Sequence, residues 1–122
     1  ANSLNTKVGS IVKSLLFKDA HNNYHLCLVS GDKYVSLDKI TNLVNETIIK
    51  ASADECKEFT GFSIGGVSPI ALDNKPKSIF IDNNLSKYKK VFAAAGHPHV
   101  VFGLSYLELC DITNGTEDNI TE

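Results

Sequence analysis

The apolar residues of this chain fall into short runs separated by clusters of turn-forming residues, and this spacing constrains the fold most strongly. Each run has the length of one β-strand or one short helix. None approaches the ~20 consecutive apolar residues that a membrane-spanning helix needs. The sequence therefore predicts a globular domain built from several short elements, without a membrane partner.

Most of these runs have the composition of β-strands. The expected strands cover residues 10–17, 24–30, 47–51, 77–82, 90–95 and 100–104. The first two runs are separated only by the polar segment 18–23, which is rich in turn formers. Two strands joined in this way are expected to pair as a hairpin.

Three further segments have helical spacing. The expected helices cover residues 36–44, 53–59 and 105–111, and a serine stands at or just before the start of each. Ser52 and Glu55 have the spacing of a capping box, and Gly61 follows as a stop signal. Because strands and helices do not alternate strictly, we expect an α+β domain with a mixed, largely antiparallel sheet.

Composition fits one domain over residues 1–122, since 43% of the residues are hydrophobic and can form a core. The net charge of −2 and the absence of arginine argue against a general nucleic-acid binder, and we expect no DNA partner. Residues 114–122 read as an acidic tail. Three cysteines without CxxC spacing (Cys27, Cys56 and Cys110) predict free thiols and a cytoplasmic protein.

The segment Gly65-Gly66-Val67-Ser68-Pro69 is the first candidate for a functional site. Adjacent glycines permit positive φ and let a ligand approach the backbone N–H groups closely. Such a turn can bind an anion or an oxyanion. The alternative is a plain structural turn.

Lys13 is the second candidate, because it lies inside the apolar run Ile11–Phe17. A lysine among apolar neighbours is rarely buried without a partner. It is either an edge residue whose ammonium reaches water or a pocket lysine aimed at a carbonyl or phosphate group.

The turn from Ala94 to His99 is the third candidate, with Ala94, Gly96 and His97 as a wall of mostly small residues. The His-Pro-His spacing offers too few ligands for zinc, which needs at least three from the protein. We therefore expect neither a metal nor a cofactor.

Five segments in order resemble the YbaK-type aminoacyl-tRNA deacylase family, which includes the editing domain of prolyl-tRNA synthetase. They are IVKSLLF, LVSGDKYVSLDKI, TGFSIGGVSPIAL, IFIDNNL and VFAAAGHPHVVFGLSYLEL, which together run from about Ile11 to Leu109. The resemblance implies a compact mixed fold with a curved sheet around a small pocket. It also implies hydrolysis of the ester that joins a wrong amino acid to tRNA, chiefly tRNA-Pro.

The resemblance assigns roles to the candidates. Lys13, Gly65 and Gly66 would be catalytic, and the substrate would contact Val67, Ser68, Pro69, Ala94, Gly96 and His97. The partners would be the aminoacylated 3′ end of tRNA and prolyl-tRNA synthetase. Family members carry an N-terminal strand and helix before the lysine strand, which we expect to be lacking here. Two alternatives stay open: a non-catalytic tRNA- or synthetase-binding module, and a purely structural interaction domain.

Overall fold

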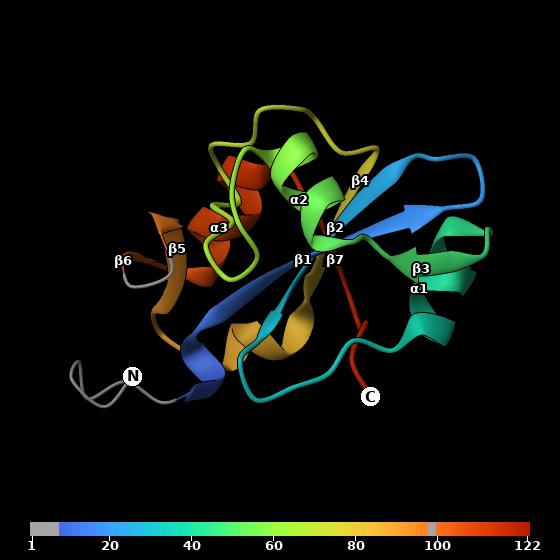
Figure 1. The fold of residues 1–122 in the computed structure, drawn as a ribbon. Coiled ribbons are helices and arrows are strands. Elements are labelled where there is room, and N and C mark those ends of the chain that lie inside the picture. Colours follow the sequence, from blue (N-terminus) through green and yellow to red (C-terminus); the bar gives the residue numbers. More distant parts are fainter. Residues whose placement is uncertain (1–7, 98–99) are drawn as a thin grey trace.

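A computed structural model describes residues 8–97 and 100–122, with His97 described by its backbone alone. A five-stranded sheet has the order β3-β1-β2-β4-β7, and β5 and β6 form a separate two-stranded sheet. Figure 1 shows α3 and the β5–β6 pair gathered at one end of the molecule, with α1 and β3 at the other. No helix in the described part of the chain is long and apolar enough to cross a membrane.

The centre of the sheet is the predicted hairpin. β1 (Val12–Asp19) and β2 (Tyr24–Ser30) pair antiparallel, with Val12 opposite Ser30. The Asp19 carboxylate closes the turn by accepting hydrogen bonds from the amides of His21 and Asn23, at 2.9 and 3.0 Å. A side-chain oxygen that binds nearby amides is a common way to fix such a turn. The expectation of a hairpin is confirmed.

The remaining strands extend this hairpin on both sides. β3 (Ile48–Lys50) pairs antiparallel with the end of β1, and β4 (Ser78–Asp82) pairs parallel with β2. β5 (Val91–His97) and β6 (Val100–Leu104) pair antiparallel with each other. The predicted α+β class with a mostly antiparallel arrangement is therefore confirmed, although β4 introduces parallel pairing.

The expectation of an acidic tail over residues 114–122 is wrong. Residues Thr116–Asp118 form β7, which pairs parallel with β4. Ile120 is fully buried, and Val35 forms an isolated antiparallel bridge with Thr121. The segment is polar because the strand is short and partly exposed, so its composition hides the buried residues Ile120 and Thr121.

The three helices form where the sequence predicts them: α1 (Leu37–Val44), α2 (Ala53–Thr60) and α3 (Tyr106–Thr113). A serine side chain caps the N-terminus of each. Ser52 and Glu55 form the expected capping box, and Ser105 and Glu108 form a second. Two 3₁₀ turns, Val8–Ser10 and Asn83–Lys87, complete the described elements.

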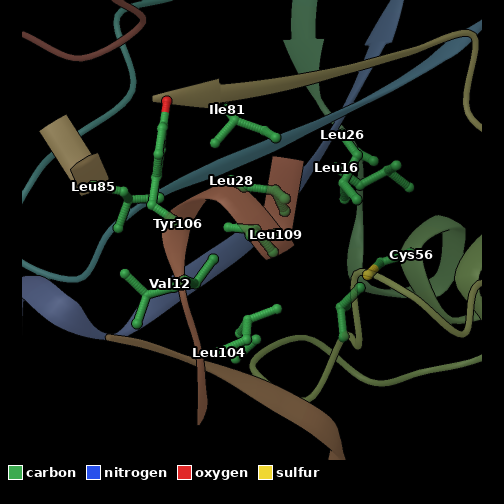
Figure 2. Close-up of a cluster of buried hydrophobic side chains, with 14 residues drawn as sticks. Val12, Leu16, Leu26, Leu28, Cys56, Ile81, Leu85, Leu104, Tyr106 and Leu109 are labelled. Carbon is green, nitrogen blue, oxygen red and sulfur yellow. The ribbon is translucent and has the colours of Figure 1, made fainter. Parts of the chain in front are cut away.

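The sheet separates two hydrophobic cores. The larger core includes Val12 and Leu16 of β1 and packs them with Leu109 of α3, as Figure 2 shows. The smaller core includes Phe17 of β1 and Ile40 of α1. Because successive strand residues point to opposite faces, β1 contributes to both cores.

Candidate functional site

A pocket of about 290 Å³ lies beside the first half of β1. Its lining takes in Ile11, Val12, Lys13, Ser14, Leu15, Ile64, Gly65, Val67 and Ala94. Neighbouring strand residues point to opposite faces, so five consecutive residues cannot all line a pocket that lies over one face. This pocket therefore runs along the edge of the strand. The structure thus brings three of the predicted segments together at one strand edge.

This edge is free because the neighbouring elements cover only its two ends. On the side away from β2, β3 begins its pairing with β1 at Phe17, and the amide of Ala51 donates to the carbonyl of Leu16 at 3.0 Å. At the other end, Ile11 forms an isolated parallel bridge with Phe92 of β5. Between them, no strand in the described part of the chain pairs with Ser14 on this side.

Lys13 lies at this edge and is partly buried. Its ammonium donates a hydrogen bond to the carbonyl of Lys33 at 2.5 Å and lies 5.2 Å from the centre of the Tyr34 ring. Both partners belong to the segment that follows β2. They hold the cation in place without neutralising it, because neither a carbonyl nor an aromatic ring carries a net charge.

The loop after α2 brings Gly65 and Val67 to the pocket. Gly65 has φ +87°, a backbone conformation that favours glycine, as its residue type predicts. The amide of Gly66 already donates to the carbonyl of Ser63 at 2.9 Å, so this loop offers fewer free donors than its sequence suggests. Ser68 and Pro69 are buried and do not line this pocket, and Pro69 borders a different hollow beside Leu72.

Among its described residues, the third predicted segment contributes one to the lining, Ala94 of β5. Gly96 has φ +92° and is not among the residues that line this pocket. The side chain of His97 and the whole of Pro98 and His99 lie outside the described residues. No group of three His, Cys, Asp or Glu side chains in the described part of the chain is arranged to hold a metal ion. Cys27, Cys56 and Cys110 are all free.

Ser14 is a pocket residue that the sequence analysis did not select. Its hydroxyl oxygen is buried and has no hydrogen-bond partner among the described residues. It also lines a second hollow of about 20 Å³ that it shares with Ala51 and Cys56, large enough for one water molecule. The sequence feature that could have pointed to Ser14 is a small polar residue next to Lys13 within an apolar run.

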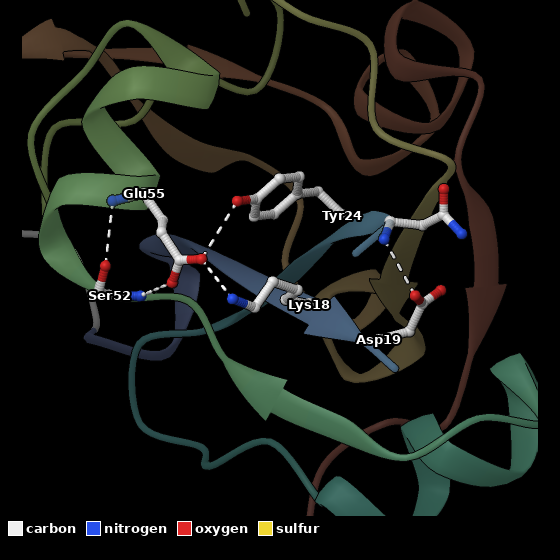
Figure 3. A network of polar contacts seen from close by, with 6 residues as sticks. Lys18, Asp19, Tyr24, Ser52 and Glu55 are labelled. Carbon is white, nitrogen blue, oxygen red and sulfur yellow. Dashed lines mark hydrogen bonds and ion pairs between the residues drawn. The ribbon is translucent and has the colours of Figure 1, made fainter. Parts of the chain in front are cut away.

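A polar network ties α2 to the end of β1 (Figure 3). Glu55 pairs with Lys18 at 2.5 Å and accepts a hydrogen bond from Tyr24 at 3.3 Å. The hydrogen bond from Lys18, supported by the Ser52 amide, lowers the pKa of Glu55 to about 2. This network holds the element that leads into the Gly65 loop.

A second pair, Asp19 and His25, is almost completely buried, with 2.9 Å between the carboxylate and the imidazole Nε2. Burial raises the pKa of Asp19, but the hydrogen bonds from His25 and the turn amides outweigh it and leave this pKa below its usual range. The pair lies at the hairpin turn and not among the pocket residues, so we assign it to the stability of β1 and β2.

Comparison with known proteins gives a consistent result. The family model described as "Aminoacyl-tRNA editing domain" matches residues 1–112. The chain is 27% identical over 113 residues to the uncharacterized Bacillus subtilis protein YwhH, and the alignment covers 93% of this chain and 71% of that protein. It is 33% identical over 97 residues to a proline–tRNA ligase of Thermosipho africanus, and this alignment covers 79% of this chain but only 17% of the ligase.

A solved structure of a candidate trans-editing enzyme for prolyl tRNA synthetase has the same fold, with a TM-score of 0.95 and 35% identity. The alignment covers 100% of this chain and 76% of that one.

Proposed function

The chain belongs to the family of aminoacyl-tRNA editing domains, and on this premise we propose that it hydrolyses the ester of mischarged aminoacyl-tRNA. The substrate would be tRNA-Pro that carries a small, wrong amino acid. The observation that carries the proposal is the pocket at the β1 edge, where Lys13, Gly65 and Ala94 meet from three separate segments. A substrate of this kind places the proposed activity in the cytoplasm.

The size and lining of the pocket support a small aminoacyl group. Its volume of about 290 Å³ is at the lower end of ligand pockets, and Ile64, Val67 and Ala94 supply apolar walls. A single methylene changes binding by only ~1–3 kcal/mol, so attraction alone discriminates weakly. We therefore propose that the pocket excludes larger amino acids by their size.

The proposed chemistry needs no protein nucleophile, because an aminoacyl ester is already activated toward water. The protein would bind the ester, place a water molecule and stabilise the negative charge on the carbonyl oxygen. Lys13 can bind the phosphate of the terminal nucleotide as a cation, because an ammonium has three N–H donors and the carbonyl of Lys33 occupies one. The amide of Gly65 is a candidate donor to the carbonyl oxygen, whereas that of Gly66 is engaged with Ser63.

The relation to prolyl-tRNA synthetase is a further part of the proposal. The chain spans about a fifth or less of the proline–tRNA ligases that it resembles, and most of YwhH. The activity could therefore belong to an editing domain within a synthetase or to a separate protein that acts on released tRNA. Both arrangements require the 3′ end of tRNA to reach the β1 edge.

A deacylation panel tests the proposal. tRNA-Pro is charged with radiolabelled alanine, serine, cysteine or proline, and the loss of label is followed with the protein in excess. We expect at least one of alanine, serine and cysteine to be released faster than without protein, and proline to be retained. If all four remain attached while the protein still binds tRNA-Pro in a gel-shift measurement, the non-catalytic binding module is the better description.

A further inference from the structure

The free edge of β1 has a consequence for how a substrate is held, because a strand edge presents backbone donors and acceptors. In an antiparallel hairpin, alternate residues of one strand direct their N–H and C=O groups toward the partner strand. The amide of Asp19 donates to the carbonyl of Asn23 at 2.9 Å, which shows that the odd-numbered residues of β1 face β2. The carbonyl of Leu16 points the other way, toward Ala51.

Ser14 lies two residues before Leu16, so its backbone N–H and C=O point toward the same outer side. That side is the pocket, which Ser14 lines. None of the described strands pairs with these two groups, so this donor and this acceptor are open to a ligand in place of water. The Ser14 hydroxyl beside them also has no partner among the described residues.

An α-amino acid ester carries the complementary pair of groups. Its ammonium is a donor and its carbonyl oxygen is an acceptor, and the two are linked through Cα and the carbonyl carbon as in a strand residue. Two residues that face each other in an antiparallel pair exchange N–H and C=O in this way.

We propose that the backbone of Ser14 binds the aminoacyl group as a one-residue strand. The Ser14 carbonyl accepts from the substrate α-ammonium, and the Ser14 amide donates to the ester carbonyl oxygen.

The charges around the pocket agree with this assignment. The ammonium of Lys13 is held by the Lys33 carbonyl and the Tyr34 ring, and strand alternation directs its side chain to the face opposite that of Ser14. The substrate α-ammonium can therefore donate to the Ser14 carbonyl without close charge repulsion from the Lys13 ammonium. The inference rests on the proposed function, and it makes a free α-amino group a condition for rapid hydrolysis.

The first test changes the substrate and leaves the protein intact. Alanyl-tRNA-Pro is compared with lactyl-tRNA-Pro, in which a hydroxyl replaces the ammonium, each rate being divided by the rate in buffer alone. A charge-assisted hydrogen bond is about twice as strong as a neutral one. We expect the lactyl ester to lose about tenfold or more of its acceleration. Equal acceleration of the two esters would overturn the proposal.

The second test removes the amide donor. Proline lacks an N–H group and is tolerated in a strand where the N–H faces away from the ladder, as it does at Ser14. Ser14→Pro should slow hydrolysis about 10²-fold, the usual effect of losing one oxyanion donor. Ser14→Ala keeps the amide and separates the loss of the side chain from the loss of the N–H group, so we expect it to be faster than Ser14→Pro. Circular dichroism checks that each variant is folded, and Ser14→Pro at wild-type rate contradicts the proposal.

A binding measurement tests the Ser14 site independently of the proposed hydrolysis. It uses the wild-type protein, so it remains informative if Ser14→Pro fails to fold. The ¹⁵N-labelled wild-type protein is titrated with alaninamide and, in parallel, with propanamide, which lacks the α-amino group. We expect the amide signal of Ser14 to shift with alaninamide alone. This shift without turnover of any ester would refute the hydrolysis and preserve the binding site. Turnover without the shift would refute the binding site alone.

Discussion

The conformation of Gly65 determines how the loop meets the pocket. Its φ of +87° lies in the region that other residues avoid, and its place in the pocket wall joins α2 to the edge of β1. A Cβ atom built on Gly65 meets no other atom within 4 Å. A side chain at this position is therefore disfavoured by backbone conformation and not by crowding.

Replacing Gly65 with alanine is expected to shift the loop and slow deacylation several-fold, since a left-handed conformation costs an ordinary residue about 1–2 kcal/mol. Gly65→Asn is the matched variant, because asparagine adopts this conformation more readily and should retain more activity. Single-turnover rates on alanyl-tRNA-Pro provide the measurement. Alanine and asparagine variants that are equally slow would indicate that side-chain volume matters instead.

At the scale of elements, the link between α2 and β1 depends on one carboxylate. Glu55 joins the capping box of α2 to Lys18 and Tyr24 of the hairpin. Because its pKa falls from 4.5 to about 2 in the folded protein, the ionised form stabilises the fold. That contribution is complete above pH 4.5 and is lost as the pH falls toward 2.

We expect Glu55→Gln to be less stable than the wild type at neutral pH and to lose less stability between about pH 4.5 and 2. Urea unfolding at several pH values measures both quantities. The Asp19–His25 pair is present in both proteins, so its acid sensitivity cancels in the comparison. Parallel pH curves for the two proteins would show that the Glu55 network adds nothing.

The elements also show which parts of the fold were predictable. The capping serines and the hairpin turn act through neighbours in sequence, and so the residues at 36, 52 and 105 mark helix starts correctly. β7 depends on pairing with the distant β4, and its few polar residues carry no strand pattern. Lys13 and Gly65 could also be selected from the sequence. The role proposed for Ser14 could not, because it depends on which edge of β1 stays unpaired in the folded sheet.

For the molecule as a whole, the C-terminal segment packs against the N-terminal half of the chain. Ile120 is fully buried in the smaller core with Phe17 and Ile40, and the amide of Glu122 donates to the carbonyl of Tyr34 at 2.9 Å. The segment thereby fixes the backbone of the residue whose ring covers the Lys13 ammonium. This contact therefore contributes both to the stability of the whole fold and to the position of the residues around Lys13.

Ile120→Ala should reduce the free energy of unfolding by about 2–5 kcal/mol, the usual cost of truncating a buried isoleucine. Ile112→Ala is the matched control, because that side chain is 55% exposed and its loss should cost no more than about 0.5 kcal/mol. Denaturant unfolding gives both values. Equal, small losses would mean that the C-terminal segment is not anchored in the core.

Hydrolysis at the β1-edge pocket with the help of the Lys13 cation is tested by single-turnover deacylation of alanyl-, seryl- and cysteinyl-tRNA-Pro. Wild type, Lys13→Ala and Lys57→Ala are compared, the last as a control on the exposed surface of α2. We predict activity on at least one ester in the wild type and Lys57→Ala, and its loss in a folded Lys13→Ala. Unchanged activity in Lys13→Ala would contradict the account.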